Sequence, residues 1–265
     1  MFSFIFSGLR DLIAGASRLS LVGALGWQDV RQRYRRSAIG PFWLTLSMGV
    51  MIASIGLVFG QILQSPIHEF FPYLSAGLIL WMFMLNTICE GCAGFISSDA
   101  IIKQLPIPLP VHAYRVLWRN IIILAHNFVI FPLVLIIVQK PIGWIAFMSV
   151  PGFIVLLINL LWMALLLATI CARYRDIPQI VASALQVMFY LTPIMWLPSM
   201  IPSKSGLLIV SINPVYHLIE IVRAPLMGAN ATQLNWIVAI GLAVAGWLVT
   251  LSVYGRYRRR IAYWL

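Results

Sequence analysis

The chain has 265 residues, of which 62% are hydrophobic and only 9% are charged, and its mean hydropathy is +0.95. Soluble globular domains carry about a quarter of charged residues, so this composition excludes that class and predicts a polytopic membrane protein. The net charge of +11 does not indicate a nucleic-acid-binding protein, because the cations stand at the margins of apolar runs and are not gathered as on a binding face.

The first residues predict an amphipathic helix that lies in the membrane interface. Apolar residues recur at helical spacing between Phe2 and Leu19, with Arg10, Asp11 and Arg18 among them. The segment lacks the basic beginning of a cleaved signal peptide. A helix resting on the cytoplasmic surface of the membrane is therefore the better interpretation.

A basic stretch, WQDVRQRYRRSAIGPFW from residue 27 to 43, follows this helix and stops abruptly at an apolar run. We call its arginines the basic elbow: Arg31, Arg33, Arg35 and Arg36. Cations close to a span are retained on the cytoplasmic side, so the basic elbow predicts that the N-terminus is inside. Pro41 fits the first turn of the helix that enters the membrane.

Six stretches are apolar and long enough to cross about 30 Å of hydrocarbon as helices. They are residues 38–63, 71–92, 117–138, 144–172, 178–197 and 234–254. With the N-terminus inside, only Lys140, Lys204 and Arg223 among the 18 lysines and arginines lie on the outer side. The charges thus follow the positive-inside rule at every loop and predict that both termini are cytoplasmic.

Two connections between these spans are long enough to contain structure of their own. The cytoplasmic one, residues 93–116, places Pro106, Pro108 and Pro110 within five positions, which predicts a stiff turn after a short helix. The outer one, residues 198–233, has short apolar runs broken by prolines, which predicts re-entrant or interfacial helices that gate the outer face. No repeat or linker divides the chain, so we expect one domain over residues 1–265.

Catalytic and metal-binding patterns are missing from the sequence. Its seven acidic residues are scattered, and only Glu90 falls within a predicted span, while His126 lies in the middle of another. Both are kept as candidates, because polar groups inside a membrane are costly, but an ion-coupled carrier would hold more of them there. Cys89 and Cys92 are read as ordinary small helix residues. We expect no catalytic residue, metal or cofactor in this chain.

An ATP-binding P-loop is also missing. The loop requires a lysine preceded by glycine and followed by Ser or Thr, and none of Lys103, Lys140 and Lys204 stands in that context. If the protein is a pump, ATP and Mg²⁺ must therefore be bound by another subunit.

Several short motifs, taken in order, resemble the membrane subunits of ABC-2 type polysaccharide exporters, which move O-antigen, capsule and teichoic acid polymers. They are RYRRSAIGPFW in the basic elbow, IIKQLPIPLP and ARYRDIP in two cytoplasmic loops, and LTPIMW at the end of the fifth predicted span, followed by IP, NP and Arg223. The resemblance runs from about residue 25 to 225. One departure is Ser47, near where relatives often carry proline, and it leaves the bend of the first span open.

The resemblance implies an all-α subunit with six spans in the bacterial inner membrane, a homodimer with the polymer channel between the protomers, and two copies of a separate nucleotide-binding ATPase. Three residues in the cytoplasmic loops would contact that ATPase: Lys103, Arg175 and Asp176. The outer gate would be formed around five others: Pro193, Pro202, Asn213, Pro214 and Arg223.

Aromatic rings suit a neutral sugar polymer, because they offer broad contact with its C–H faces. We expect some of five rings in the second and fifth predicted spans to line the polymer path, although lipid-facing positions near the interfaces are the ordinary role of such residues. The five are Trp81, Phe83, Phe189, Tyr190 and Trp196.

Together these patterns predict the permease subunit of an ATP-driven exporter that carries a lipid-linked polysaccharide of the O-antigen type. One alternative within the class is an ABC-2 exporter of a drug or another lipid. An alternative from another class is a membrane-embedded glycosyl or lipid transferase, which the scattered acidic residues disfavour.

Overall fold

The computed structural model describes residues 2–35, 40, 42–64, 66–198, 208 and 210–265, and these residues contain helices and no strand. The predicted all-α class is therefore confirmed for the described part of the chain. The helices are α1 (Phe2–Ala16), α2 (Leu19–Tyr34), α3 (Phe42–Ile62), α4 (Ile67–Ala93), α5 (Asp99–Gln104), α6 (Pro110–Phe128), α7 (Ile130–Ile137), α8 (Ser149–Arg173), α9 (Ile177–Leu191), α11 (Pro214–Leu226) and α12 (Gln233–Trp264), with the 3-10 turns η1 (Ile96–Ser98) and η2 (Trp144–Met148).

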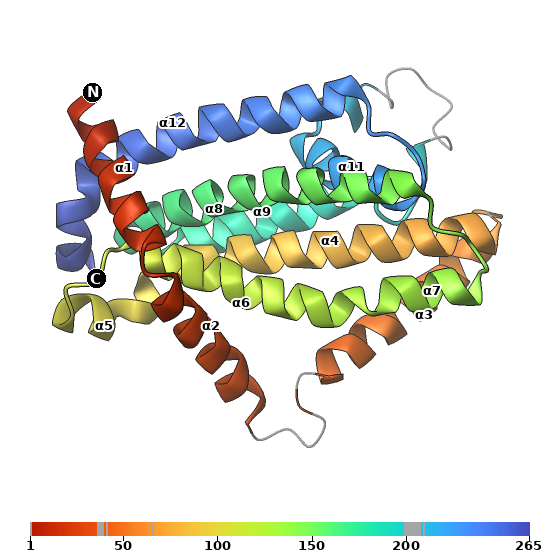
Figure 1. The fold of residues 1–265 in the computed structure, drawn as a ribbon, viewed down its shortest axis with the longest axis horizontal. Coiled ribbons are helices and arrows are strands. Elements are labelled where there is room, and N and C mark those ends of the chain that lie inside the picture. Colours follow the sequence, from red (N-terminus) through yellow and green to blue (C-terminus); the bar gives the residue numbers. More distant parts are fainter. Residues whose placement is uncertain (1, 36–39, 41, 65, 199–207, 209) are drawn as a thin grey trace.

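Five helical segments are long and apolar enough to cross a membrane, as expected of a multi-pass membrane protein. They are Phe42–Ile62, Ile67–Ala93, Pro110–Ile137, Trp144–Arg173 and Gln233–Trp264. In Figure 1 most of them run along the long axis of the molecule, with α6 and α7 forming one continuous path.

The predicted fifth span, residues 178–197, differs from the others because its helix α9 ends at Leu191. At 1.5 Å per residue its 15 residues reach about 22 Å, which is less than the hydrocarbon thickness of about 30 Å. The chain becomes extended at Thr192, since the following Pro193 disfavours the helical conformation in the residue before it. The described residues thus contain five helices of spanning length and one shorter apolar helix.

The centre of the bundle is α4, which contacts α3, α6, α7, α8, α9 and α11. In its most apolar window 78% of the residues are buried, against 17% for α3. A Cβ atom at Gly91 of α4 would lie 2.8 Å from the Cα atom of Ala164 in α8, so the glycine permits close packing of the two helices. By contrast, α3 packs on α4 and α6 along one side, its first turns project from the bundle in Figure 1, and it exposes Trp43, Val50 and Leu57.

The two ends of the chain lie at the same end of the molecule (Figure 1) and are packed together. The predicted N-terminal helix is present as α1, and it packs on α12. The Tyr254 hydroxyl donates to Asp11 at 3.1 Å, and Arg258 forms an ion pair with Asp11 at 2.5 Å. A Cβ atom at Gly255 would lie 2.0 Å from the carbonyl oxygen of Phe4, so only glycine allows the backbones to approach this closely.

The two long connections resemble the predictions where the structure describes them. The cytoplasmic one forms the short helix α5 followed by a turn with extended backbone at Leu105, and Pro110 opens α6. In the outer one, α11 packs against α4, α8 and α12. Of the preceding apolar run, residues 207–212, the structure describes 208 and 210–212, which are helical. The re-entrant character of the segment stays a prediction.

Candidate functional site

The residues expected to contact an ATPase lie on two exposed surfaces at the end of the bundle that holds the C-terminus. Lys103 is on α5 and forms an ion pair with Asp99 at 2.9 Å, with its side chain 47% exposed. Arg175 and Asp176 form the turn between α8 and α9 and are exposed. The Asp176 carbonyl accepts a hydrogen bond from the amide of Gln179 at 3.1 Å, which opens α9. Both surfaces are accessible to a partner protein.

A network of charges ties α2 to the bundle, and we call it the cytoplasmic ion network after the side of the membrane on which the sequence predicts it. It consists of Asp29 and Arg33 of α2, Glu90 of α4, and Arg115, Arg119 and Asn120 of α6. All three helices therefore contribute to it.

Arg119 is the centre of this network because it bonds both carboxylates. Its Nη1 lies 2.9 Å from Asp29 Oδ2, and its Nη2 lies 2.6 Å from Glu90 Oε2. Glu90 also accepts from Arg33 Nη2 at 2.8 Å. Bonds between charged groups at these distances are strong, so the guanidinium of Arg119 holds three helices together.

The remaining members complete the bonding of the two acids. Arg115 donates to Asp29 through Nε at 2.7 Å and forms a second, shorter bond through Nη2. Asn120 donates to Glu90 Oε2 at 2.7 Å. The Glu90 carboxylate, retained as a candidate because it is a charge within a span, is thus fully occupied by partners and stabilises the junction of α2, α4 and α6.

The basic elbow is divided by this arrangement. Arg33 belongs to the cytoplasmic ion network, whereas Arg31 and Arg35 are exposed. Arg36 lies outside the described residues. Sequence reasoning assigned all four arginines to topology and missed the structural role of Arg33. The signal was present in Arg115 and Arg119, since residues four apart share one face of a helix.

A second cluster, the outer arginine cluster, surrounds Arg223 of α11, whose side chain is 1% exposed. Its Nη1 donates to the Pro193 carbonyl at 2.8 Å, and its Nε and Nη2 donate to Glu220 at 3.0 and 2.6 Å. The guanidinium carbon lies 3.9 Å from the ring centroid of Tyr73, a distance at which cation–π attraction is strong. Gly77 of α4 makes room, since a Cβ atom there would lie 3.1 Å from Nη1.

Charge and burial act in opposite directions on Arg223. Burial disfavours the charged guanidinium and lowers its pKa, but the Glu220 carboxylate raises it, and the resulting pKa lies above the usual value. Arg223 is therefore a permanent buried cation, compensated by one carboxylate from its own helix.

The same cluster brings together most of the residues predicted for the outer gate. The Tyr73 hydroxyl also donates to the Pro193 carbonyl, at 2.9 Å. Asn213 caps α11 by accepting from the amide of Val215 at 2.9 Å, and it donates to the Thr192 hydroxyl at 2.9 Å. Pro214 occupies the first turn of α11. Pro202 lies outside the described residues, and the gating role itself stays a prediction.

The five aromatic rings proposed for the polymer path separate into different environments. Trp81 is 3% exposed and lies 5.5 Å from the ring of Phe189, which in turn lies 5.5 Å from Tyr190. Phe83 is 4% exposed and packs on Phe153 at 5.8 Å. Trp81, Phe189 and Tyr190 thus form a row of three rings between α4 and α9, and Phe83 is not part of this row.

Exposure along this row increases outward, since Tyr190 is 64% exposed. Trp196 lies beyond the end of α9 and is half-buried. Among the five rings, Tyr190 offers the largest free surface to a polymer or a partner. The assignment of these rings to the polymer path stays a prediction.

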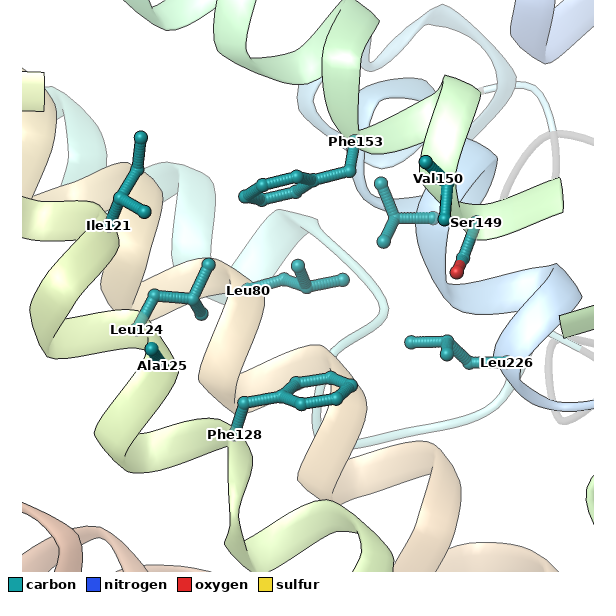
Figure 2. A pocket seen from close by; sticks show the side chains of 10 residues that line it. Leu80, Ile121, Leu124, Ala125, Phe128, Ser149, Val150, Phe153 and Leu226 are labelled. Atoms are coloured by element: carbon teal, nitrogen blue, oxygen red, sulfur yellow. The ribbon is translucent and has the colours of Figure 1, made fainter. Parts of the chain in front are cut away.

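An apolar pocket of about 390 Å³ lies between α4, α6, α8 and α11, and sequence reasoning did not foresee it (Figure 2). Leu80, Leu124, Phe128 and Phe153 point into it. The hydroxyl of Ser149 at its edge donates to the Ala146 carbonyl at 2.6 Å. The pocket therefore offers contact for hydrocarbon and no hydrogen bonds for a sugar.

The described residues contain no group of three His, Cys, Asp or Glu side chains that could hold a metal ion. His126, a candidate because of its position within a span, places its Nδ1 atom 2.8 Å from the carbonyl oxygen of Ile122 in its own helix. Its ring also packs edge to face on the ring of Phe42 in α3, with the two ring centroids 6.3 Å apart. These contacts give His126 a packing role between α6 and α3.

Comparison of the sequence with known proteins places the chain among transporters. Residues 20–227 match the family described as ABC-2 type transporter. A Myxococcus xanthus protein named O-antigen export system permease protein RfbA is 25% identical over 209 residues, covering 77% of this chain and 79% of the relative.

Two Klebsiella pneumoniae proteins carry the same name. They are 23% and 24% identical over 241 and 240 residues, and each alignment covers 89% of this chain and 91% of the relative. The family match extends from α2 to the end of α11 and so includes both clusters of charges and both loops predicted to be cytoplasmic. The chain belongs to the ABC-2 type transporter family and is a transport subunit.

Proposed function

We propose that this chain is the permease subunit of an ATP-driven exporter that moves a lipid-linked polysaccharide of the O-antigen type from the cytoplasm to the periplasm. The observation that carries the proposal is the match to relatives named O-antigen export permease, which extends over 79 to 91% of their length. The membership of the ABC-2 family agrees with it.

The permease works with a separate ATPase that binds ATP and Mg²⁺. Support comes from the sequence, in which no lysine stands in a P-loop, and from the exposed surfaces around Lys103 and around Arg175 and Asp176. Both surfaces lie at the end that holds the C-terminus, so one partner can reach both. The location is the inner membrane, with this end and both termini in the cytoplasm.

The functional unit is a homodimer with two copies of the ATPase, and α9 is a shortened fifth crossing of six. Of the residues of α9 only Leu185 is buried, and Ile180, Val187 and Tyr190 are largely exposed. The helix α3 is similarly uncovered. Apolar surface of this extent on two helices suits a second copy, and a polymer path between the copies would be lined from α9.

The experiment that tests the function is deletion of the gene in the native bacterium. We expect surface polysaccharide to be lost and lipid-linked polymer to accumulate inside, and both effects to be reversed by the plasmid-borne gene. Unchanged surface polysaccharide together with sensitivity to a drug would favour the alternative exporter class.

The coupling loop is tested by the double substitution Arg175→Ala and Asp176→Ala. We expect the variant to insert normally and to retain α9, because these two side chains are exposed, but to export less polymer for each ATP hydrolysed. Normal export at equal membrane abundance would contradict the coupling role of the turn.

A further inference from the structure

The last turn of α12 is packed against the rest of the protein and is not a free end. Ile261 is fully buried, and Trp264 and Leu265 pack against the same apolar cluster, which includes Phe95 and Ala172. The end of α12 runs along one edge of the molecule, and the C-terminus lies beside α5 (Figure 1). A terminus held this way has its position determined by its neighbours.

Trp264 connects this last turn to the loop that follows α8. The guanidinium carbon of Arg173, the final residue of α8, lies 5.4 Å from the ring centroid of Trp264 and 5.2 Å from that of Tyr174. Tyr257, which is also in α12, packs on the ring of Trp264, with the two ring centroids 5.5 Å apart. Both rings lie within cation–π range of Arg173, so Trp264 contacts the residue at which α8 ends and the turn carrying Arg175 begins.

The same last turn also reaches the first cytoplasmic loop. The helix α5 contacts α12, and Ile102 of α5 packs against the same buried cluster as Trp264 and Leu265. Lys103, which follows Ile102, points to the exposed side and pairs with Asp99. The helix α12 thus contacts α5, which carries Lys103, and its last turn contacts Arg173, which precedes the turn carrying Arg175.

We propose that the last turn of α12 is a bracket that holds the two cytoplasmic loops at a fixed spacing, with Trp264 and Leu265 as positioning residues. The bracket makes α5 and the turn at 173–176 into one docking platform for the ATPase partner, and this second part rests on the proposed function.

The spacing is measured with spin labels at Gln104→Cys and Arg175→Cys in a full chain without its three native cysteines. We expect a narrow distance distribution that broadens in Trp264→Ala and in a chain lacking Leu265, and that is restored in Trp264→Phe, which keeps a ring on Arg173. The matched control is Tyr263→Ala, because this neighbouring ring is 90% exposed. An unchanged distribution in Trp264→Ala would overturn the bracket.

The platform is tested in the complex with the ATPase. We expect Trp264→Ala to retain ATP hydrolysis while export per ATP falls several-fold, and Tyr263→Ala to behave as the parent. Export at the parental level from Trp264→Ala, despite a broadened distance distribution, would overturn the platform role. If the parent chain assembles with no ATPase, the proposed function and the platform fail together, while the distance measurement still decides the bracket.

Discussion

The two charged clusters hold helices together in opposite ways. In the cytoplasmic ion network three arginines share two carboxylates, and the paired side chains are 11 to 20% exposed apart from Arg33 at 46%. In the outer arginine cluster one guanidinium that is 1% exposed depends on a single carboxylate, Glu220. The first cluster is redundant and its arginines are partly exposed, whereas in the second a single buried arginine relies on Glu220, which is itself 19% exposed.

The difference shows where a lost partner is costly. A buried charge without its partner cannot be hydrated, and removing one side of such a pair typically costs about 3–5 kcal/mol. A charge in a shared and partly exposed network retains other partners and some water. The outer cluster should therefore be the more sensitive of the two, although it contains fewer ion pairs.

The largest effect is expected for Glu220→Gln, which leaves the Arg223 guanidinium buried without a carboxylate. We expect the free energy of unfolding in detergent to fall by about 3–5 kcal/mol. Denaturant titration of the purified protein measures it, with Glu69→Gln as the control because Glu69 is exposed. Recovery of stability when Arg223→Met is added would support the explanation, and equal stability of Glu220→Gln and the parent would refute it.

A smaller effect is expected for Arg119→Ala, which removes the central bonds of the cytoplasmic ion network. Hydrogen bonds to charged groups contribute about 1.5–3 kcal/mol, and Asp29 keeps Arg115 while Glu90 keeps Arg33. Hydrogen exchange should rise in α2 and stay unchanged in α11. Arg115→Ala is the matched comparison and should lose less, since its carboxylate partner Asp29 retains Arg119. Equal protection of α2 in both variants would contradict the central role of Arg119.

A still smaller loss is expected at the cap that joins the outer cluster to α9. Asn213→Ala removes the acceptor for the amide of Val215 and the donor to Thr192. The loss of an N-cap costs about 0.5–2 kcal/mol. Asn213→Asp keeps the acceptor and should recover part of the stability in the same denaturant titration. If the aspartate variant is no more stable than the alanine variant, the cap contributes nothing.

The smallest effect is expected for Lys103→Ala. Its partner Asp99 is four positions away, and the two side chains are 47% and 41% exposed, so the pair contributes about 0.5 kcal/mol or less. The free energy of unfolding should thus stay at the parental level, while the stimulation of ATP hydrolysis in the partner by the permease falls. A clear loss of stability would show that Lys103 has a structural role and would contradict its assignment to coupling with the ATPase.

Local patterns in the sequence predicted the features that depend on neighbouring residues. The prolines at 106, 108 and 110 predicted a short helix and a stiff turn, and the structure has α5 followed by an extended residue, Leu105. The apolar runs predicted the long helices. The early end of α9 was missed because the restriction that Pro193 imposes on Thr192 was given less weight than the apolar run continuing to Leu197.

Contacts between distant residues could not be derived from local patterns. Arg223 was assigned to the outer side and to the outer gate, but its burial was not foreseen, because Glu220, Tyr73 and the Pro193 carbonyl converge on it from three segments. Glu90 was recognised as unusual, but its partner Arg33 lies 57 positions away. A single sequence contains the charges and does not show which of them meet.

The junction of α1 and α12 has a consequence for the order of assembly during synthesis. Asp11 and Tyr254, which are hydrogen-bonded, are 243 positions apart, and ribosomes add about 5–20 residues per second. The helix α1 therefore waits roughly 10 to 50 s after its own synthesis for α12. Until then α1 can pack only on α6, which it also contacts, and the side that meets α12 is left to lipid or to a chaperone.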